Sequence, residues 1–146
     1  MTVSASVNTI TYHGDGSTKS FSAPFRVLLE SDIKLYLTNR STNVVTEIVS
    51  DYSITPDDGV WPTKSLTVVY PVTADAITSD YNLTIVRTVA NTQESEFGTN
   101  TNDIMPRSIE LALDKIVMQV QQLEAEVVRS IKLVIGSDMD AETLST

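Results

Sequence analysis

Short runs in which apolar and polar residues alternate fill the first part of the chain, and segments rich in Gly, Pro, Asn and Asp separate them. This period of two is typical of β-strands with one buried face. It predicts strands over residues 8–13, 18–23, 32–40, 43–50, 52–56, 64–71 and 81–89. Because no helical pattern lies between these runs, we predict a mainly β fold whose head is an antiparallel β-sandwich or a small barrel.

The sequence HGDGST, residues 13–18, separates the first two predicted strands. Gly14 and Gly16 tolerate positive φ, so we predict a hairpin turn with 18–23 as the return strand. A phosphate-binding loop needs a longer glycine-rich segment with a Lys and a following helix. A calcium loop needs several acidic ligands, and only Asp15 is present in this segment. The segment is therefore interpreted as a structural turn and not as a phosphate or metal site.

A helical period replaces the alternation after residue 100. Pro106 suits the first turn of a helix, and we predict one long C-terminal α-helix over 106–135. Its apolar residues recur in alternating steps of 4 and 3, which is the spacing of a coiled-coil seam. The seam consists of Ile109, Leu113, Ile116, Val120, Leu123 and Val127.

Two arrangements of this helix follow from the pattern. The seam either packs on the protein's own sheet or pairs with copies of itself, and its mixture of Leu and β-branched residues does not decide the number of strands. Val117, Val128 and Leu111 form a second apolar edge. We expect this second edge to cover the sheet while the seam faces sister helices.

Composition narrows the possible partners. The 146 residues include 41% apolar and 20% charged residues, which is enough for a packed core, and the net charge is -9. A chain this acidic repels nucleic acid and anionic membranes, so we expect neither as a partner. There is no cysteine, which excludes disulfides and thiolate metal sites. The N-terminal residues do not resemble a secretory signal, and no window is apolar enough for a membrane helix.

Residues with catalytic potential are few. His13 is the only histidine and stands at a strand end, with no serine elbow elsewhere. The acidic pairs Asp57/Asp58 and Glu94/Glu96 lie in a turn and in a polar connector, where solvated or capping carboxylates are usual. Aromatic residues that suit a carbohydrate platform are better used in the core; they are Trp61, Phe21, Phe25 and Tyr36. We expect no enzyme, cofactor or metal site.

Three ordered motifs carry a family resemblance. The first comprises Tyr12, Gly14, Asp15, Gly16, Ser17, Thr18, Phe21, Pro24 and Phe25. The second comprises Arg87, Thr88, Gln93, Glu96 and Phe97. The third comprises Ala112, Leu113, Asp114, Lys115, Gln121, Gln122 and Leu123. Together they resemble the N-terminal virion-anchoring domain of tail fibres and tailspikes from short-tailed bacteriophages, the podoviruses of the Autographiviridae type.

The resemblance implies a structural protein of the virion. Such a domain fastens a trimeric fibre to adaptor and nozzle proteins of the tail tube, for host adhesion. It implies a homotrimer built on the seam, with a docking head over 1–98, a connector over 99–105, the trimerisation helix over 106–135 and a polar tail or linker over 136–146. The chain is then either the anchoring piece of a longer fibre or a short adaptor that receives a second fibre or spike. The alternatives are a carbohydrate-binding or depolymerase domain of a tailspike, and a head–tail connector or capsid decoration protein.

Overall fold

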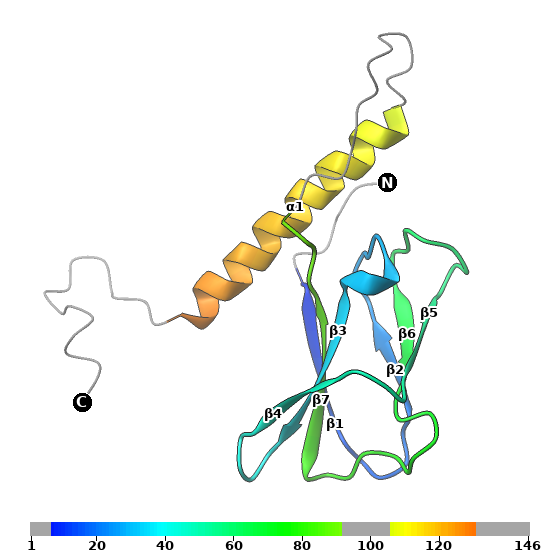
Figure 1. Ribbon diagram of the computed structural model, residues 1–146, viewed down its shortest axis with the longest axis vertical. Helices are drawn as coiled ribbons and strands as arrows, with labels where there is room; N and C mark the ends of the chain where they lie inside the picture. The colour runs from blue at the N-terminus through cyan, green and yellow to red at the C-terminus, as the bar shows by residue number, and fades with distance from the viewer. Residues whose placement is uncertain (1–6, 92–105, 131–146) are drawn as a thin grey trace, which may run out of the picture.

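Two open antiparallel β-sheets form the head of the protein in a computed structural model, which describes residues 7–91 and 106–130 (Figure 1). The larger sheet has the strand order β1-β7-β3-β4 and the smaller one the order β2-β6-β5. The larger sheet contains β1 (Thr9–His13), β3 (Ile33–Asn39), β4 (Val45–Ile48) and β7 (Tyr81–Arg87). The smaller sheet contains β2 (Ser20–Ala23), β5 (Ser53–Pro56) and β6 (Leu66–Val69). Every predicted strand is present, and within the described residues neither sheet closes into the barrel that was the alternative.

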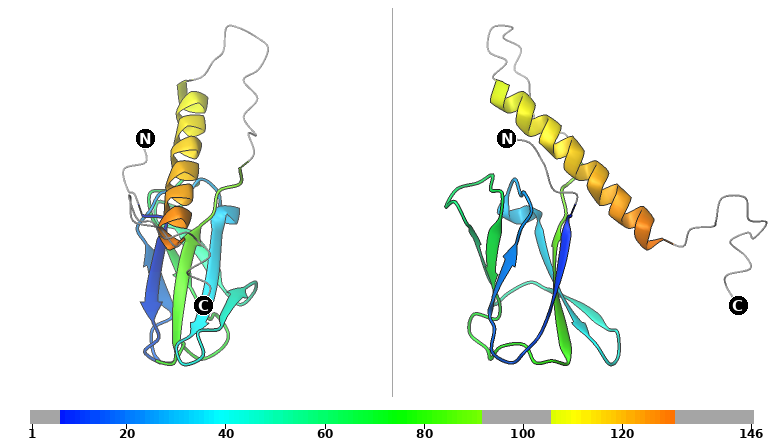
Figure 2. Two further views of the ribbon diagram at one scale, coloured as in Figure 1. Left: turned by 90° about the vertical axis from the view of Figure 1, so that its left-hand side faces the viewer. Right: turned by 180° about the vertical axis from the view of Figure 1, so that it is seen from behind.

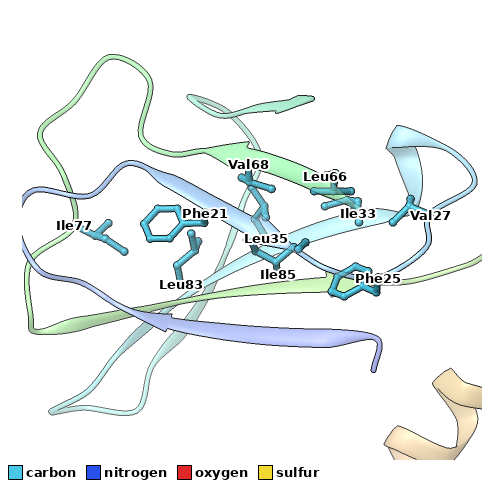
Figure 3. Close-up of a cluster of buried hydrophobic side chains, with 11 residues drawn as sticks. Phe21, Phe25, Val27, Ile33, Leu35, Leu66, Val68, Ile77, Leu83 and Ile85 are labelled. Carbon is cyan, nitrogen blue, oxygen red and sulfur yellow. The ribbon is translucent and has the colours of Figure 1, made fainter. Parts of the chain in front are cut away.

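One apolar core lies between the two sheets (Figure 3). Alternation along β7 sends Leu83 and Ile85 into this core, where both are fully buried, while Thr84 and Val86 face outward. Across the sheet Ile85 is in register with Ile10 of β1 and Leu35 of β3. The smaller sheet supplies Phe21, Leu66 and Val68 from its own inner face. The period-two pattern of the sequence thus places the core correctly.

The predicted hairpin between the first two strands is not formed. β1 pairs with β7 in the larger sheet, and β2 pairs with β6 in the smaller sheet. The loop between them therefore carries the chain from one sheet to the other. Its backbone is held by the β6–β7 loop and the start of β7 instead, because the amide of Gly14 donates to Tyr81 O at 2.9 Å and that of Gly16 to Ile77 O at 2.9 Å.

The C-terminal helix α1 (Pro106–Arg129) begins at the proline that the sequence indicated. It crosses one end of the head, over the beginning of β1 and the chain that leaves β7 (Figures 1 and 2). A one-turn 3-10 helix, η1 (Glu30–Asp32), leads into β3 at the same end. The predicted helix residues 131–135, the connector 99–105 and the tail 136–146 lie outside the described residues.

Candidate functional site

A buried ion pair joins α1 to the head. Arg26 follows the end of β2, and its NH2 group lies 2.7 Å from Oδ2 of Asp114 in the helix. Both side chains are only 6% exposed. The remaining donors of this guanidinium, Nε and NH1, have no hydrogen-bond acceptor among the described residues. A charge buried this deeply is tolerated only with its partner in place, so this pair fixes how the two elements meet.

A second arginine, Arg87, lies beside the first at the end of β7. It is 1% exposed, and its guanidinium donates from NH1 to Arg26 O at 2.7 Å and from NH2 to Gln121 Oε1 at 2.6 Å. The same group lies 5.9 Å from the centre of the Phe25 ring, within cation–π range. Burial lowers the pKa of Arg87, while the charge of Asp32 acts in the opposite direction. Arg87 thus contacts the core and the helix at once.

Amide side chains of α1 add further hydrogen bonds between the helix and the head. Gln122 Oε1 accepts a hydrogen bond from the Val89 amide at 3.0 Å, and Gln119 Nε2 donates to Ala90 O at 2.9 Å. Met118 is fully buried in the middle of this face. We call Arg26, Arg87, Asp114, Gln121 and Gln122 the polar joint. The helix is held against the head largely by charged and amide groups around one methionine.

The opposite face of α1 is apolar and uncovered in the single chain. The six seam residues are between 40% and 60% exposed. At 100° per residue they occupy the side of the helix directly opposite Met118. The alternative in which the seam packs on the protein's own sheet is therefore not what the structure shows, whereas contact of the seam with other copies stays a prediction.

The second apolar edge does not cover the sheet as expected. Val117 is 42% exposed and Val128 is 65% exposed, and Leu111 alone of the three is half-buried. The side of α1 that meets the head carries Asp114 and Gln121 instead, which contact Arg26 and Arg87. Leu111 lines a groove beside the polar joint together with Leu29, Trp61 and Val89. The loop that contains Trp61 thus lies at the helix end of the head.

The HGDGST loop is an internally bonded turn. The Asp15 carboxylate accepts hydrogen bonds from the amides of Ser17 and Thr18 and from the Thr18 hydroxyl, at 2.8, 2.7 and 2.6 Å. These bonds hold the pKa of Asp15 well below its usual range, with the Thr18 hydroxyl as the largest cause. Gly16 has φ +74°, whereas Gly14 is buried against the neighbouring loop. The local interpretation of this segment as architecture is consistent with these contacts.

The other candidate residues are not assembled into one site. His13 is exposed and its Nδ1 lies 2.6 Å from Asn82 Oδ1. Asp57 accepts hydrogen bonds from the hydroxyls of Ser65 and Thr67, which ties its loop to β6. Glu94 and Glu96 lie outside the described residues.

The aromatic residues do not form a platform. Phe21 and Phe25 are buried in the core, Tyr36 lies on the outer face of β3, and Trp61 is half-buried at the helix end. Among the described residues no three Asp, Glu or His side chains are grouped as metal ligands. In the same part of the chain no helix has the apolar length that a bilayer-spanning segment requires.

Two of the three sequence motifs contribute residues to the polar joint, and the first contributes Phe25, whose ring lies beside Arg87. Phe25 comes from the first motif, Arg87 from the second, and Asp114, Gln121 and Gln122 from the third. Sequence reasoning missed Arg26, which lies three residues after the end of β2 and resembles an ordinary surface residue in the sequence. It also missed that the polar residues of the helix form one stripe with Met118 at its centre.

Comparison with known proteins finds similarity to a phage tail protein. The chain is 30% identical over 127 residues to the tail spike protein of Salmonella phage epsilon15. The match covers 86% of this chain and 11% of that protein, so the chain spans only a small part of the relative's length. No family model matches the chain.

Proposed function

We propose that this protein is a structural module of a phage tail, in which the seam of α1 assembles three copies and the head anchors a fibre or tailspike to the tail. The observation that carries the proposal is the uncovered seam, whose six apolar residues are each at least 40% exposed while the opposite face of α1 is packed on the head. The similarity to a phage tail spike protein supports the location in the virion. The number three follows the family resemblance.

Burial of the seam supplies the driving force for assembly. Full burial of an exposed Leu, Ile or Val side chain contributes about 1.5–3 kcal/mol, and the seam residues, which are 40–60% exposed, contribute about half of that each. An apolar stripe of this length on a soluble chain is typical of an interaction surface. In heptad terms the seam residues occupy positions a and d, and Met118 occupies position f, which points away from the bundle axis. Three helices can therefore join at their seams while each carries its own head on the outside.

The charges beside the seam favour parallel helices. Glu110 and Glu124 occupy e positions, and Gln119 and Glu126 occupy g positions. In a parallel bundle Gln119 of one copy lies next to Glu124 of its neighbour, which brings no like charges together. An antiparallel pair centred on Val117 places Glu110 against Glu124 on both sides. Parallel helices also carry all heads at the same level, as an anchor with three-fold symmetry requires.

The experiment is a measurement of molar mass by light scattering over a micromolar concentration series. We expect the unchanged chain to be a trimer, and Ile116→Asp and Leu123→Asp to be monomers. Val60→Asp is the matched control, because Val60 is 61% exposed on the head, outside the seam. A monomeric unchanged chain, or an unchanged oligomer in both seam variants, contradicts the proposal. If the unchanged chain is a dimer and both seam variants are monomers, the seam is still the interface, but the three-fold arrangement is wrong.

Attachment to the tail is tested separately, in a reconstruction of the virion. The head is expected at a site of three-fold local symmetry on the tail, in contact with adaptor or nozzle proteins. Density for this chain on the capsid surface or at the portal would instead favour a decoration or connector protein.

A further inference from the structure

The end of the head that contacts α1 contains two arginine side chains that are buried from solvent. Arg26 is 6% exposed and Arg87 is 1% exposed. Burying a guanidinium without an acceptor is strongly unfavourable, because the lost hydration is not replaced. Whatever covers this end must therefore bring hydrogen-bond acceptors to defined positions.

The two faces of α1 differ in their ability to meet this requirement. The face centred on Met118 offers the Asp114 carboxylate to Arg26 and the Gln121 amide oxygen to Arg87. The seam consists only of Leu, Ile and Val, which carry no side-chain acceptor. Hydrophobic burial alone would favour the seam for covering the head, since its six residues are more apolar than the face that is docked.

We propose that Arg26 and Arg87 select which face of α1 packs on the head, and that they thereby keep the apolar seam available for a partner. The two arginines exclude the seam from the head, because docking it would take the Asp114 carboxylate from Arg26 and the Gln121 acceptor from Arg87 while both guanidiniums stay buried. They accept the opposite face, because it supplies the Asp114 carboxylate to Arg26 and the Gln121 amide oxygen to Arg87. This role does not depend on the number of assembled copies or on the location of the protein in a tail.

Intramolecular cross-linking can report which face is docked, since the chain has no cysteine of its own. Thr9 and Ala125 line the same groove between the head and the helix. Val127, two residues after Ala125, belongs to the seam. Two chains are compared, one with Thr9→Cys and Ala125→Cys and one with Thr9→Cys and Val127→Cys. Each is treated with a short bis-maleimide, and the product linked within one chain is quantified by mass spectrometry.

In the otherwise unchanged chain we expect the Thr9/Ala125 yield to exceed the Thr9/Val127 yield at least about tenfold, because the alternative docking leaves buried charges unpaired. In Arg26→Met/Arg87→Met this ratio should fall toward one, since methionine has similar length and no charge. Lys34→Met/Arg40→Met is the matched control, because it replaces two exposed basic residues of the head outside the polar joint. That control should keep the tenfold ratio.

A ratio that stays tenfold in Arg26→Met/Arg87→Met overturns the proposal, because the face is then selected by something else, such as Met118. Amide exchange in β3 and β7 shows whether the head of this variant is folded. If it is not, Asp114→Leu/Gln121→Leu/Gln122→Leu decides, because it alters only the helix. The proposal predicts that the Thr9/Ala125 yield falls at least about fivefold in this triple variant, since both arginines lose their acceptors on the helix and the Val89 amide loses Gln122. An undiminished yield overturns it.

Discussion

The backbone amide of Val89, just after β7, donates a hydrogen bond to Oε1 of Gln122 in α1 at 3.0 Å, across 33 residues of sequence. A side chain of the helix thus satisfies a main-chain group of the head. In a sheet such an amide would be paired with a neighbouring strand, and here the helix takes the place of that strand. The exchange rate of this single amide therefore reports whether the helix is docked.

Gln122→Leu should expose the Val89 amide to solvent. We expect its hydrogen exchange to accelerate about five- to tenfold, the factor that corresponds to the net contribution of one hydrogen bond. The amides of Leu83 and Ile85 should keep their exchange rates, because their partners are in the sheet. Gln122→Glu, which retains an acceptor at the same place, is the matched control. Exchange at Val89 that is unchanged in Gln122→Leu would show that this bond does not hold the helix.

Gly14 and Gly16 should respond differently to substitution by alanine. A Cβ at Gly14 would lie 2.0 Å from Thr78 O and 2.6 Å from Ile77 O, which are backbone atoms that move only with the chain. A Cβ at Gly16 meets nothing within 4 Å, but its φ is +74°. We expect Gly14→Ala to lower the unfolding free energy by more than about 3 kcal/mol and Gly16→Ala by about 1–2 kcal/mol. Urea denaturation measures both, and equal losses would contradict the close approach at Gly14.

The Asp15 turn should contribute to the loss of unfolding free energy at acid pH. Hydrogen bonds from Thr18 and Ser17 lower the pKa of Asp15 from its ordinary value of 3.8. A lowered folded-state pKa gives stability that is present above the unfolded-state pKa and is lost as the pH falls through the folded-state value. We therefore expect the unfolding free energy to decline with pH below about 4, and Asp15→Asn to make this decline shallower.

Thr18→Val tests the cause of that pH dependence. It removes the hydroxyl that contributes most to the lowered pKa of Asp15 and leaves the carboxylate in place. The decline of its unfolding free energy with falling pH should be intermediate between that of the unchanged chain and that of Asp15→Asn. The urea midpoint of each chain is measured from neutral to acid pH. If the midpoint falls by the same amount in all three chains, the turn does not have this role.

The two faces of β7 should differ in their sensitivity to truncation. Ile85 is fully buried between the sheets, while Val86 is half-buried on the outer face. We expect Ile85→Ala to lower the unfolding free energy by about 2–5 kcal/mol and Val86→Ala by no more than about 1 kcal/mol. Chemical denaturation of both variants checks the difference. A larger loss for Val86→Ala would mean that another element covers the outer face in solution.

The strands and the start of the helix could be predicted because they depend on local pattern. Alternation at Leu83 and Ile85 and the position of Pro106 are visible without any knowledge of contacts. The assignment of β1 and β2 to different sheets could not be predicted in this way. A Gly-Asp-Gly turn is compatible with a hairpin, and the long-range pairing of β1 with β7 and of β2 with β6 is what shows that the chain changes sheets.

The seam was also visible in the sequence, since its spacing does not depend on what it contacts. The polar joint was not, because Arg26 and Arg87 are far apart in the chain and each resembles an ordinary surface residue. Their burial follows from the end of β2 meeting the end of β7. Asp114 and Gln121 similarly resemble the solvated face of a helix until their partners are known.

Arg87 donates to the carbonyl of a residue 61 positions earlier, so the docking site of the helix does not exist until both sheets are complete. β2 and β7 belong to different sheets, and the arginines at their ends meet only when the two layers are packed. A helix that contacts both arginines cannot dock in this way on a head whose two sheets are not packed together. Docking of the helix through this site is therefore thermodynamically coupled to packing of the two sheets, and a change that separates the sheets should also release the helix.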